Sequence, residues 1–190
     1  MTPEQAAELL ESVGAVSRGH FKLSSGRHSD LYVEKTRILE RPEATMAVAR
    51  AMASRYERID VVVAPAIGAI ALGFAVALAG GARSLFAERG EGRMQLRRGF
   101  KIVPGERALA VEDVVTTGAS AREVYEMLGE LGAERLGVAA LVDRTTQSVS
   151  FPLRALVRIE ASSWEPDDCP LCHDGRPFDS PGSRHLERSG

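Results

Sequence analysis

Short, unbroken apolar runs that alternate with helix-like segments limit the folds open to this chain. Residues 60–64 read DVVVA, a β-branched run without polar alternation, which is typical of a strand covered on both faces. Similar runs occur at 84–88, 108–112, 135–143 and 154–160. Helical patterns separate several of them, for example over 121–133. This alternation predicts an α/β fold with an open, mostly parallel sheet flanked by helices and joined by right-handed crossovers.

The first 40 residues depart from this rhythm. Thr2, Pro3 and Gln5 have the pattern of a capping box before a short helix. Two short alternating segments, around Phe21 and around Leu31, then predict a pair of strands joined by a polar turn. We therefore expect a single domain over 1–190. Its expected parts are an N-terminal helix and hood (1–40), an α/β core (41–160) and an irregular C-terminal tail (161–190).

Composition narrows the classes of partner. The chain has 24 basic and 26 acidic residues and a formal net charge of −2, which argues against a nucleic-acid or anionic-membrane binder. The apolar run around Gly73 is too short to cross a bilayer. The acidic start MTPEQAAELLES lacks the layout of a signal peptide. Two cysteines make no disulfide framework, so we expect a cytoplasmic protein.

The segment ALAVEDVVTTGAS (108–120) carries the strongest functional signal. Glu112 and Asp113 end an apolar run, and adjacent carboxylates repel each other without helping a core. Ligands of parallel sheets bind beyond such strand ends. The following turn, with hydroxyls and Gly118, leads into a helix whose first N–H groups favour a phosphate. A ribose 5-phosphate satisfies both features, with its hydroxyls on the acids and its phosphate in the turn.

Other phosphate and metal motifs fit this segment less well. A P-loop needs a lysine after the glycine, where Ala119 stands, and APAIGAIALG lacks the glycine spacing of a dinucleotide fingerprint. Two valines interrupt the oxygen ligands that a calcium loop needs. A plain helix cap by Thr117 or Ser120 is the simplest alternative, but it leaves the acid pair unexplained.

The stretch VEDVVTTGAS resembles the 5-phosphoribosyl 1-pyrophosphate (PRPP) signature of type I phosphoribosyltransferases. The resemblance implies that family's fold, a hood, a flexible flap and a Mg²⁺ ion bound mainly through PRPP, with no protein side chain assigned as a metal ligand. It assigns PRPP binding to the acid pair, the turn and Arg89. These residues are Arg89, Glu112, Asp113, Val114, Val115, Thr116, Thr117, Gly118, Ala119 and Ser120, of which Arg89, Glu112 and Asp113 are also expected to serve catalysis.

Three further segments are similar to orotate phosphoribosyltransferases in particular. They are FKLSSGRHSDLYV in the hood, APAIGAI after the first core strand, and LVDRTT at a later strand end. The resemblance implies that Arg144 and Thr116 bind orotate. A guanidinium suits the orotate carboxylate, because it can bind both oxygens at once. It also implies a homodimer and a role in pyrimidine biosynthesis.

The expected flap, about 87–101, departs from the long lysine-containing flap of many members. It carries Arg89, Arg93, Arg97 and Arg98 and has no lysine before Lys101, so it resembles a short-flap branch. A solvent-exposed hairpin is the alternative for these charges. Two other functions remain open at this point. One is transfer to a purine base, and the other is a regulator that senses PRPP without catalysis.

CPLCH at 169–173 has the spacing of half a zinc site. Its nearest candidate partners in the sequence are Asp167, Asp168, Asp174 and His185. Because four cysteines are absent, ordinary thiols are the favoured interpretation. For His20 and His28 in the hood, we favour polar turn residues over substrate contacts.

Overall fold

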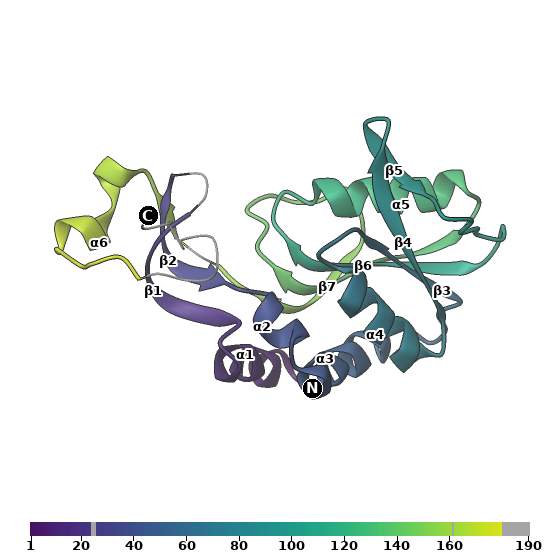
Figure 1. Ribbon diagram of the computed structural model, residues 1–190, viewed down its shortest axis with the longest axis horizontal. Coiled ribbons are helices and arrows are strands. Elements are labelled where there is room, and N and C mark those ends of the chain that lie inside the picture. Colours follow the sequence, from purple (N-terminus) through teal and green to yellow (C-terminus); the bar gives the residue numbers. More distant parts are fainter. Residues whose placement is uncertain (24–25, 161, 180–190) are drawn as a thin grey trace, which may run out of the picture.

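The structure, a computed structural model, describes residues 1–23, 26–160 and 162–179. It contains a large sheet with helices on both faces and a smaller sheet set to one side (Figure 1). His185 therefore lies outside the described residues, as do residue 161 and the other residues of 180–190 in the predicted tail.

The large sheet has the order β5-β4-β3-β6-β7-β8. Its strands are β3 (Val61–Pro65), β4 (Arg83–Gly90), β5 (Arg93–Leu96), β6 (Arg107–Val115), β7 (Glu134–Asp143) and β8 (Leu153–Arg158). All neighbours are parallel except β4 and β5, which form an antiparallel hairpin. This confirms the predicted α/β fold with a mostly parallel sheet.

Helices cover the two faces of the large sheet as the strand periodicity requires. On β3, Val62 packs toward α1 (Pro3–Ser12), α3 (Pro42–Ala53) and α4 (Ile70–Gly80). Val61 and Val63 point to the opposite face, which α5 (Ala119–Glu130) covers. All three valines are fully buried. A strand buried on both faces has no polar alternation, which is why DVVVA is a continuous apolar run.

The chain changes direction in the sheet between β3 and β6. From β3 it proceeds to β4 and β5 on one side, then returns to β6 on the other side and continues to β7 and β8. The loop after β3 leads to α4 on one face of the sheet, and the loop after β6 leads to α5 on the opposite face. The two loops therefore diverge at the carboxyl ends of these strands. Such a topological switch point is where open α/β sheets bind ligands.

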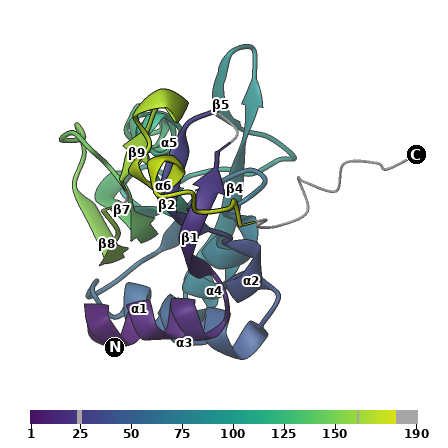
Figure 2. The same cartoon turned by 90° about the vertical axis from the view of Figure 1, so that its left-hand side faces the viewer.

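The smaller sheet combines the two ends of the chain. Strands β1 (Val16–Lys22) and β2 (His28–Val33) form the predicted pair, and β9 (Ser163–Trp164) adds to β2. From here on, the word hood means this three-stranded sheet, which includes β9 as well as the predicted N-terminal strands. A 3-10 turn (Pro166–Asp168) and α6 (Pro170–His173) follow and lie beside β1 and β2 (Figure 2). A four-residue helix, α2 (Thr36–Leu39), leads from the hood to the core.

The described part of the tail, predicted to be irregular, differs from that expectation. Its order comes from contacts with the hood: Ser29 Oγ donates to the Ser162 carbonyl at 2.9 Å, and the Arg27 guanidinium bonds Ser163 and Glu165. These contacts span more than 130 residues of sequence, so no local pattern could predict them. Among the described residues, no helix has the length and apolar character to cross a membrane.

A glycine fixes how closely α4 approaches β3. A Cβ built at Gly73 would lie 2.7 Å from the Cβ of Ala64, which no real pair of carbon atoms tolerates. We expect Gly73→Ala to lower the free energy of unfolding by about 1–3 kcal/mol, because the helix must move off the sheet. Urea unfolding followed by circular dichroism measures this change.

The matched control is Gly129→Ala in α5, where the nearest atoms are the movable guanidinium of Arg135 at 3.1 Å. That variant should be neutral or more stable by up to about 1 kcal/mol, since alanine favours helix. Equal losses in the two variants would contradict the packing explanation.

Candidate active site

The acid pair lies at the carboxyl end of β6, next to the switch point. Asp113 is only 3 % exposed, and Glu112 is largely buried beside it. Burial, and next the negative charge of Asp113, raise the pKa of Glu112 to about 8. Backbone N–H groups partly compensate: that of Val114 donates to Asp113 Oδ1 at 2.7 Å. The pair is therefore held in an electrostatically costly position.

Lys35 is the charged group nearest to Asp113. It follows β2 and precedes α2, and its Nζ lies 2.5 Å from Asp113 Oδ2. The approach lacks hydrogen-bond geometry, so Asp113 Oδ2 has no hydrogen-bond donor among the described residues. The sequence analysis did not identify Lys35. Its only local signal is a basic residue directly after the hood strand, and its partner is 78 positions away.

The loop after β6 and the first turn of α5 enclose a small cavity of about 80 Å³, lined by Glu112 and residues 114–121. Gly118 is the N-cap of α5 with φ +74°, and no side chain caps the helix there. The plain-cap alternative is thus not seen; Thr117 Oγ1 only accepts a long 3.4 Å bond from the N–H of Ala119. Open N–H groups at a helix N-terminus favour an anion.

The loop after β3 closes the other side of the acid pair. A Cβ at Gly68 would lie 2.5 Å from Lys35 Nζ and 2.8 Å from Asp113 Oδ2. A side chain at this position would displace the Lys35 ammonium or the Asp113 carboxylate from its present place. The preceding Ala66–Ile67 peptide bond is cis.

Arg144 begins the loop after β7, the strand adjacent to β6. Its backbone N–H donates to the Val115 carbonyl at 2.8 Å, which places it directly beside the loop that holds Thr116. Burial lowers the pKa of the half-buried Arg144, and the charge of Asp30 in the hood opposes that effect. Within the described part of the chain, its guanidinium has no hydrogen-bond or ion-pair partner.

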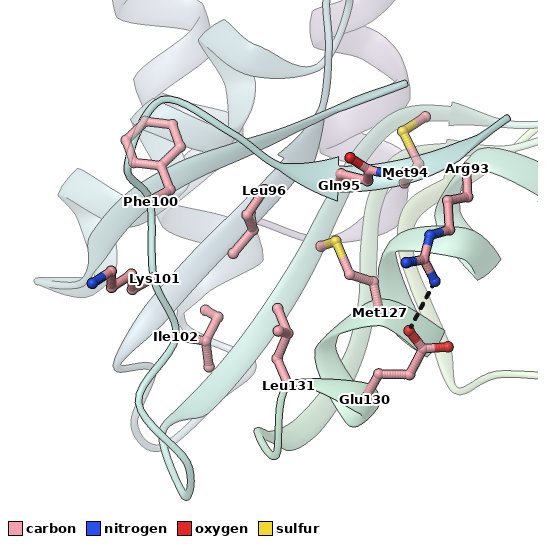
Figure 3. Close-up of a pocket in the computed structure, with 10 residues that line it drawn as sticks. All are labelled: Arg93, Met94, Gln95, Leu96, Phe100, Lys101, Ile102, Met127, Glu130 and Leu131. Atoms are coloured by element: carbon pink, nitrogen blue, oxygen red, sulfur yellow. Dashed lines mark ion pairs between the residues drawn. The ribbon is translucent and has the colours of Figure 1, made fainter. Parts of the chain in front are cut away.

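The arginines of the expected flap lie on the β4–β5 hairpin and just after it. Arg89 Nη2 donates to Glu123 Oε1 at 2.9 Å, so it contacts α5 about one turn after the first helical residue, Ala119. Arg98 binds Glu88 through two bonds of 2.9 Å. Arg93 lies 3.9 Å from Glu130 (Figure 3). The structure thus brings Arg89 near α5 but pairs it with an acid of this chain.

A separate hollow of about 360 Å³ lies between this hairpin and α5. Figure 3 shows that Leu96, Ile102 and Met127 line it together with Arg93 and Glu130. It shares no lining residue with the cavity at 112–121.

Comparison with known proteins identifies the family of this chain. The model of the phosphoribosyl transferase domain family matches residues 34–150. This segment includes the acid pair, the loop after β6 and Arg144. A match over more than half of the chain defines the class: the protein is a phosphoribosyltransferase.

The relatives define the family more closely. The orotate phosphoribosyltransferase of Caldanaerobacter subterraneus is 45 % identical over 98 % of this chain and all of its own length. That of Thermotoga maritima is 47 % identical over 95 % of this chain and 98 % of its own. The crystal structure of the Aeropyrum pernix enzyme aligns with a TM-score of 0.66 and 27 % identity, covering 80 % of this chain and 93 % of that one. The chain belongs to the orotate phosphoribosyltransferase family.

The raised pKa of Glu112 predicts a pH-dependent stability. Between about pH 4.5 and 8 the folded protein keeps a proton on Glu112 that the unfolded chain has released. The free energy of unfolding of the wild type should therefore fall with rising pH relative to Glu112→Gln, by up to about 1.4 kcal/mol per pH unit in this window. Paired denaturant titrations at several pH values measure the difference.

Glu57→Gln is the control, since Glu57 is exposed after α3. Its difference from the wild type should not vary with pH. A difference between wild type and Glu112→Gln that stays constant from pH 5 to 8 would contradict a buried, protonated Glu112.

Proposed function

We propose that this chain transfers the ribose 5-phosphate group from PRPP to orotate, releasing pyrophosphate and forming orotidine 5-monophosphate for pyrimidine (UMP) biosynthesis. One observation carries the residue assignment. A buried acid pair and an open helix N-terminus adjoin at the switch point of the sheet, and Arg144, a guanidinium without a partner among the described residues, stands one strand away.

PRPP carries a 5-phosphate and ribose hydroxyls, which suit the cavity after β6 and the acid pair respectively. Its 5-phosphate fits the cavity of residues 114–121, where backbone N–H groups and the hydroxyls of Thr116, Thr117 and Ser120 can donate. Its 2- and 3-hydroxyls can donate to Glu112 and Asp113. Lys35 offsets the charge of Asp113, so the acids can lie close to the phosphate without strong repulsion.

For orotate we propose a position at Arg144, which lies close enough to Asp30 of the hood for the charge of Asp30 to act on its guanidinium. Both oxygens of the orotate carboxylate would accept hydrogen bonds from the Arg144 guanidinium. Thr116, at the exposed start of the loop after β6, would form a hydrogen bond with the orotate ring. A partly buried arginine binds such a group more strongly than an exposed one, because less water competes. Adenine and hypoxanthine lack a carboxylate, which disfavours the purine alternative.

The reaction breaks the bond between C1 of the ribose and the pyrophosphate oxygen and forms a bond from C1 to N1 of orotate. Orotate already supplies a nitrogen nucleophile, so no strong base is needed. Positive charge develops on the ribose beside Glu112 and Asp113. This charge favours loss of the Glu112 proton to solvent, so both carboxylates can stabilise it. Arg89 would bind the leaving pyrophosphate after releasing Glu123, and closure of the hairpin would exclude water.

The acid pair also suits the Mg²⁺ ion that accompanies PRPP. Carboxylate oxygens are the ligands that Mg²⁺ prefers, and Glu112, which lines the cavity after β6, has no ion-pair partner among the described residues. Glu112 and Asp113 would hold the ion directly or through its water, while PRPP supplies the other ligands. When bound, the ion neutralises charge on the pyrophosphate.

Two predictions from the sequence concern the whole molecule. We propose that the protein is a homodimer located in the cytoplasm. Sedimentation velocity at micromolar concentration would show a single species of twice the chain mass, and a monomer would contradict the dimer.

A direct assay tests the proposed activity and its acid pair. With PRPP and Mg²⁺, pyrophosphate release should depend on orotate and not on adenine, hypoxanthine or xanthine. The double variant Glu112→Gln with Asp113→Asn should lose at least about 100-fold in turnover, because the stabilising charge is gone. Release with a purine in place of orotate would favour the first alternative, and PRPP binding without release would favour the sensor.

Two arginine variants should separate the two substrates. Arg144→Ala should raise KM for orotate roughly 10- to 100-fold with little change in KM for PRPP, since a charged hydrogen-bond pair is lost. Arg89→Ala should instead lower kcat by roughly 10- to 100-fold with KM for orotate unchanged. Arg93→Ala, on the same hairpin but paired weakly with Glu130, serves as control. Identical effects of Arg144→Ala and Arg89→Ala would refute these roles.

A further inference from the structure

Four potential metal ligands meet at one point between the hood and the tail. His20 lies on β1 and His28 on β2, while Cys169 and Cys172 begin and continue α6. Their ligand atoms all lie within 4.8 Å of one another. His20, His28 and Cys169 are 1 %, 5 % and 0 % exposed, and Cys172 is half-buried.

The separations between these atoms match a tetrahedral site. Cys169 Sγ lies 3.5 Å and Cys172 Sγ 3.7 Å from His20 Nε2, and Cys172 Sγ lies 3.3 Å from His28 Nδ1. Zinc–sulfur bonds of about 2.3 Å and zinc–nitrogen bonds of about 2.0–2.1 Å place neighbouring ligand atoms of a tetrahedron about 3.3–3.8 Å apart. Three of the six separations thus already match a bound ion, and the others, all within 4.8 Å, require only small movements of the ligands.

The surroundings orient the ligands. His20 Nδ1 lies 2.8 Å from the Arg176 carbonyl, which can only accept, so Nδ1 carries the proton and Nε2 presents its lone pair to the cysteines. Asp179 accepts a bond from the His20 backbone N–H at 2.9 Å. The Phe178 ring packs on both imidazoles, with centroids 4.1 and 4.8 Å away. Histidine ligands of metals are held in this way.

Charge balance favours an ion over a bare cluster. Two thiolates and two neutral imidazoles around Zn²⁺ sum to zero, so the site can be buried at little electrostatic cost. Without an ion, His20 Nε2 and His28 Nδ1 would face only thiols, which are weak hydrogen-bond donors. Both cysteines are free thiols, so no disulfide occupies them. A set of two sulfur and two nitrogen ligands in a tetrahedron suits zinc.

We propose that His20, His28, Cys169 and Cys172 bind a structural zinc ion that fastens the tail to the hood. On binding, two S–H bonds lose their protons to solvent and two Zn–S and two Zn–N bonds form, with no change of oxidation state. Four protein ligands leave no open position, so the ion has no catalytic role. All four residues lie outside the segment that the phosphoribosyl transferase family model matches.

The site joins parts of the chain that have few other contacts. Beyond the paired strands β2 and β9, the described tail depends on hydrogen bonds from the hood rather than on a shared apolar core. The hood strand β2 also leads into Lys35, which pairs with Asp113.

The structure differs from the sequence interpretation of CPLCH. The side chains beside the two cysteines are the hood histidines, whereas His173 is exposed, with its Nε2 near the Asp167 carbonyl.

Metal analysis of the untagged, reduced full-length protein is the first test. We expect one zinc per chain after purification, and release of about two protons on zinc binding to the apoprotein. Replacement by Co²⁺ should give intense thiolate-to-cobalt charge-transfer absorption and the visible bands of tetrahedral cobalt. This measurement requires no variant, so misfolding cannot obscure it. Failure of the reduced protein to bind either metal would overturn the proposal.

Variants then identify the ligands. Cys172→Ser and His28→Ala should each lower zinc content or affinity more than ~10-fold, whereas His173→Ala, next to Cys172 but exposed, should keep full content. Removing zinc should increase the cleavage of the tail by protease while the core remains resistant. Equal zinc loss in His173→Ala, or full zinc retention in Cys172→Ser, would refute this ligand set.

Discussion

Two adjacent carboxyl groups are buried at the end of β6, and much of the structure serves to keep them there. Burial and mutual repulsion raise the pKa of Glu112. Lys35 reaches across from the end of the hood strand, and Gly68 leaves space for it against Asp113. The helix α5 presents open N–H groups directly behind the pair. The sugar phosphate that we propose for this site would relieve this arrangement, because its hydroxyls and phosphate would supply the missing partners.

The hood contributes to this site through its continuity along the chain. Strand β2 contains His28 of the proposed zinc site and Asp30, whose charge acts on Arg144, and it is followed by Lys35. Two contacts of the active site and one ligand of the proposed zinc site thus depend on where one strand lies. An ion that fixes this strand to the tail would restrict the motions of all three at once, without touching either substrate.

The predicted and the observed elements agree where a structural feature depends on residues that are neighbours in the sequence. The run DVVVA is a doubly covered strand, Thr2 and Gln5 form the capping box, and EDVVTTGAS is a strand end, turn and helix start. The misses share one physical origin. Lys35 meets Asp113 across 78 positions, and His20 meets Cys169 across 149. Neither pairing leaves a periodicity or spacing that a reader of the sequence could recognise.

By itself, the sequence determined the sheet class, the position of the acid pair and the turn into the following helix, because burial on two faces and helix initiation depend on neighbouring residues. The resemblance of its motifs indicated orotate as the base. Only the tertiary structure decided which charge balances Asp113, that Arg89 contacts Glu123, and that two histidines lie beside the cysteine pair. These contacts form between distant segments, and their geometry exists only once the sheets have assembled.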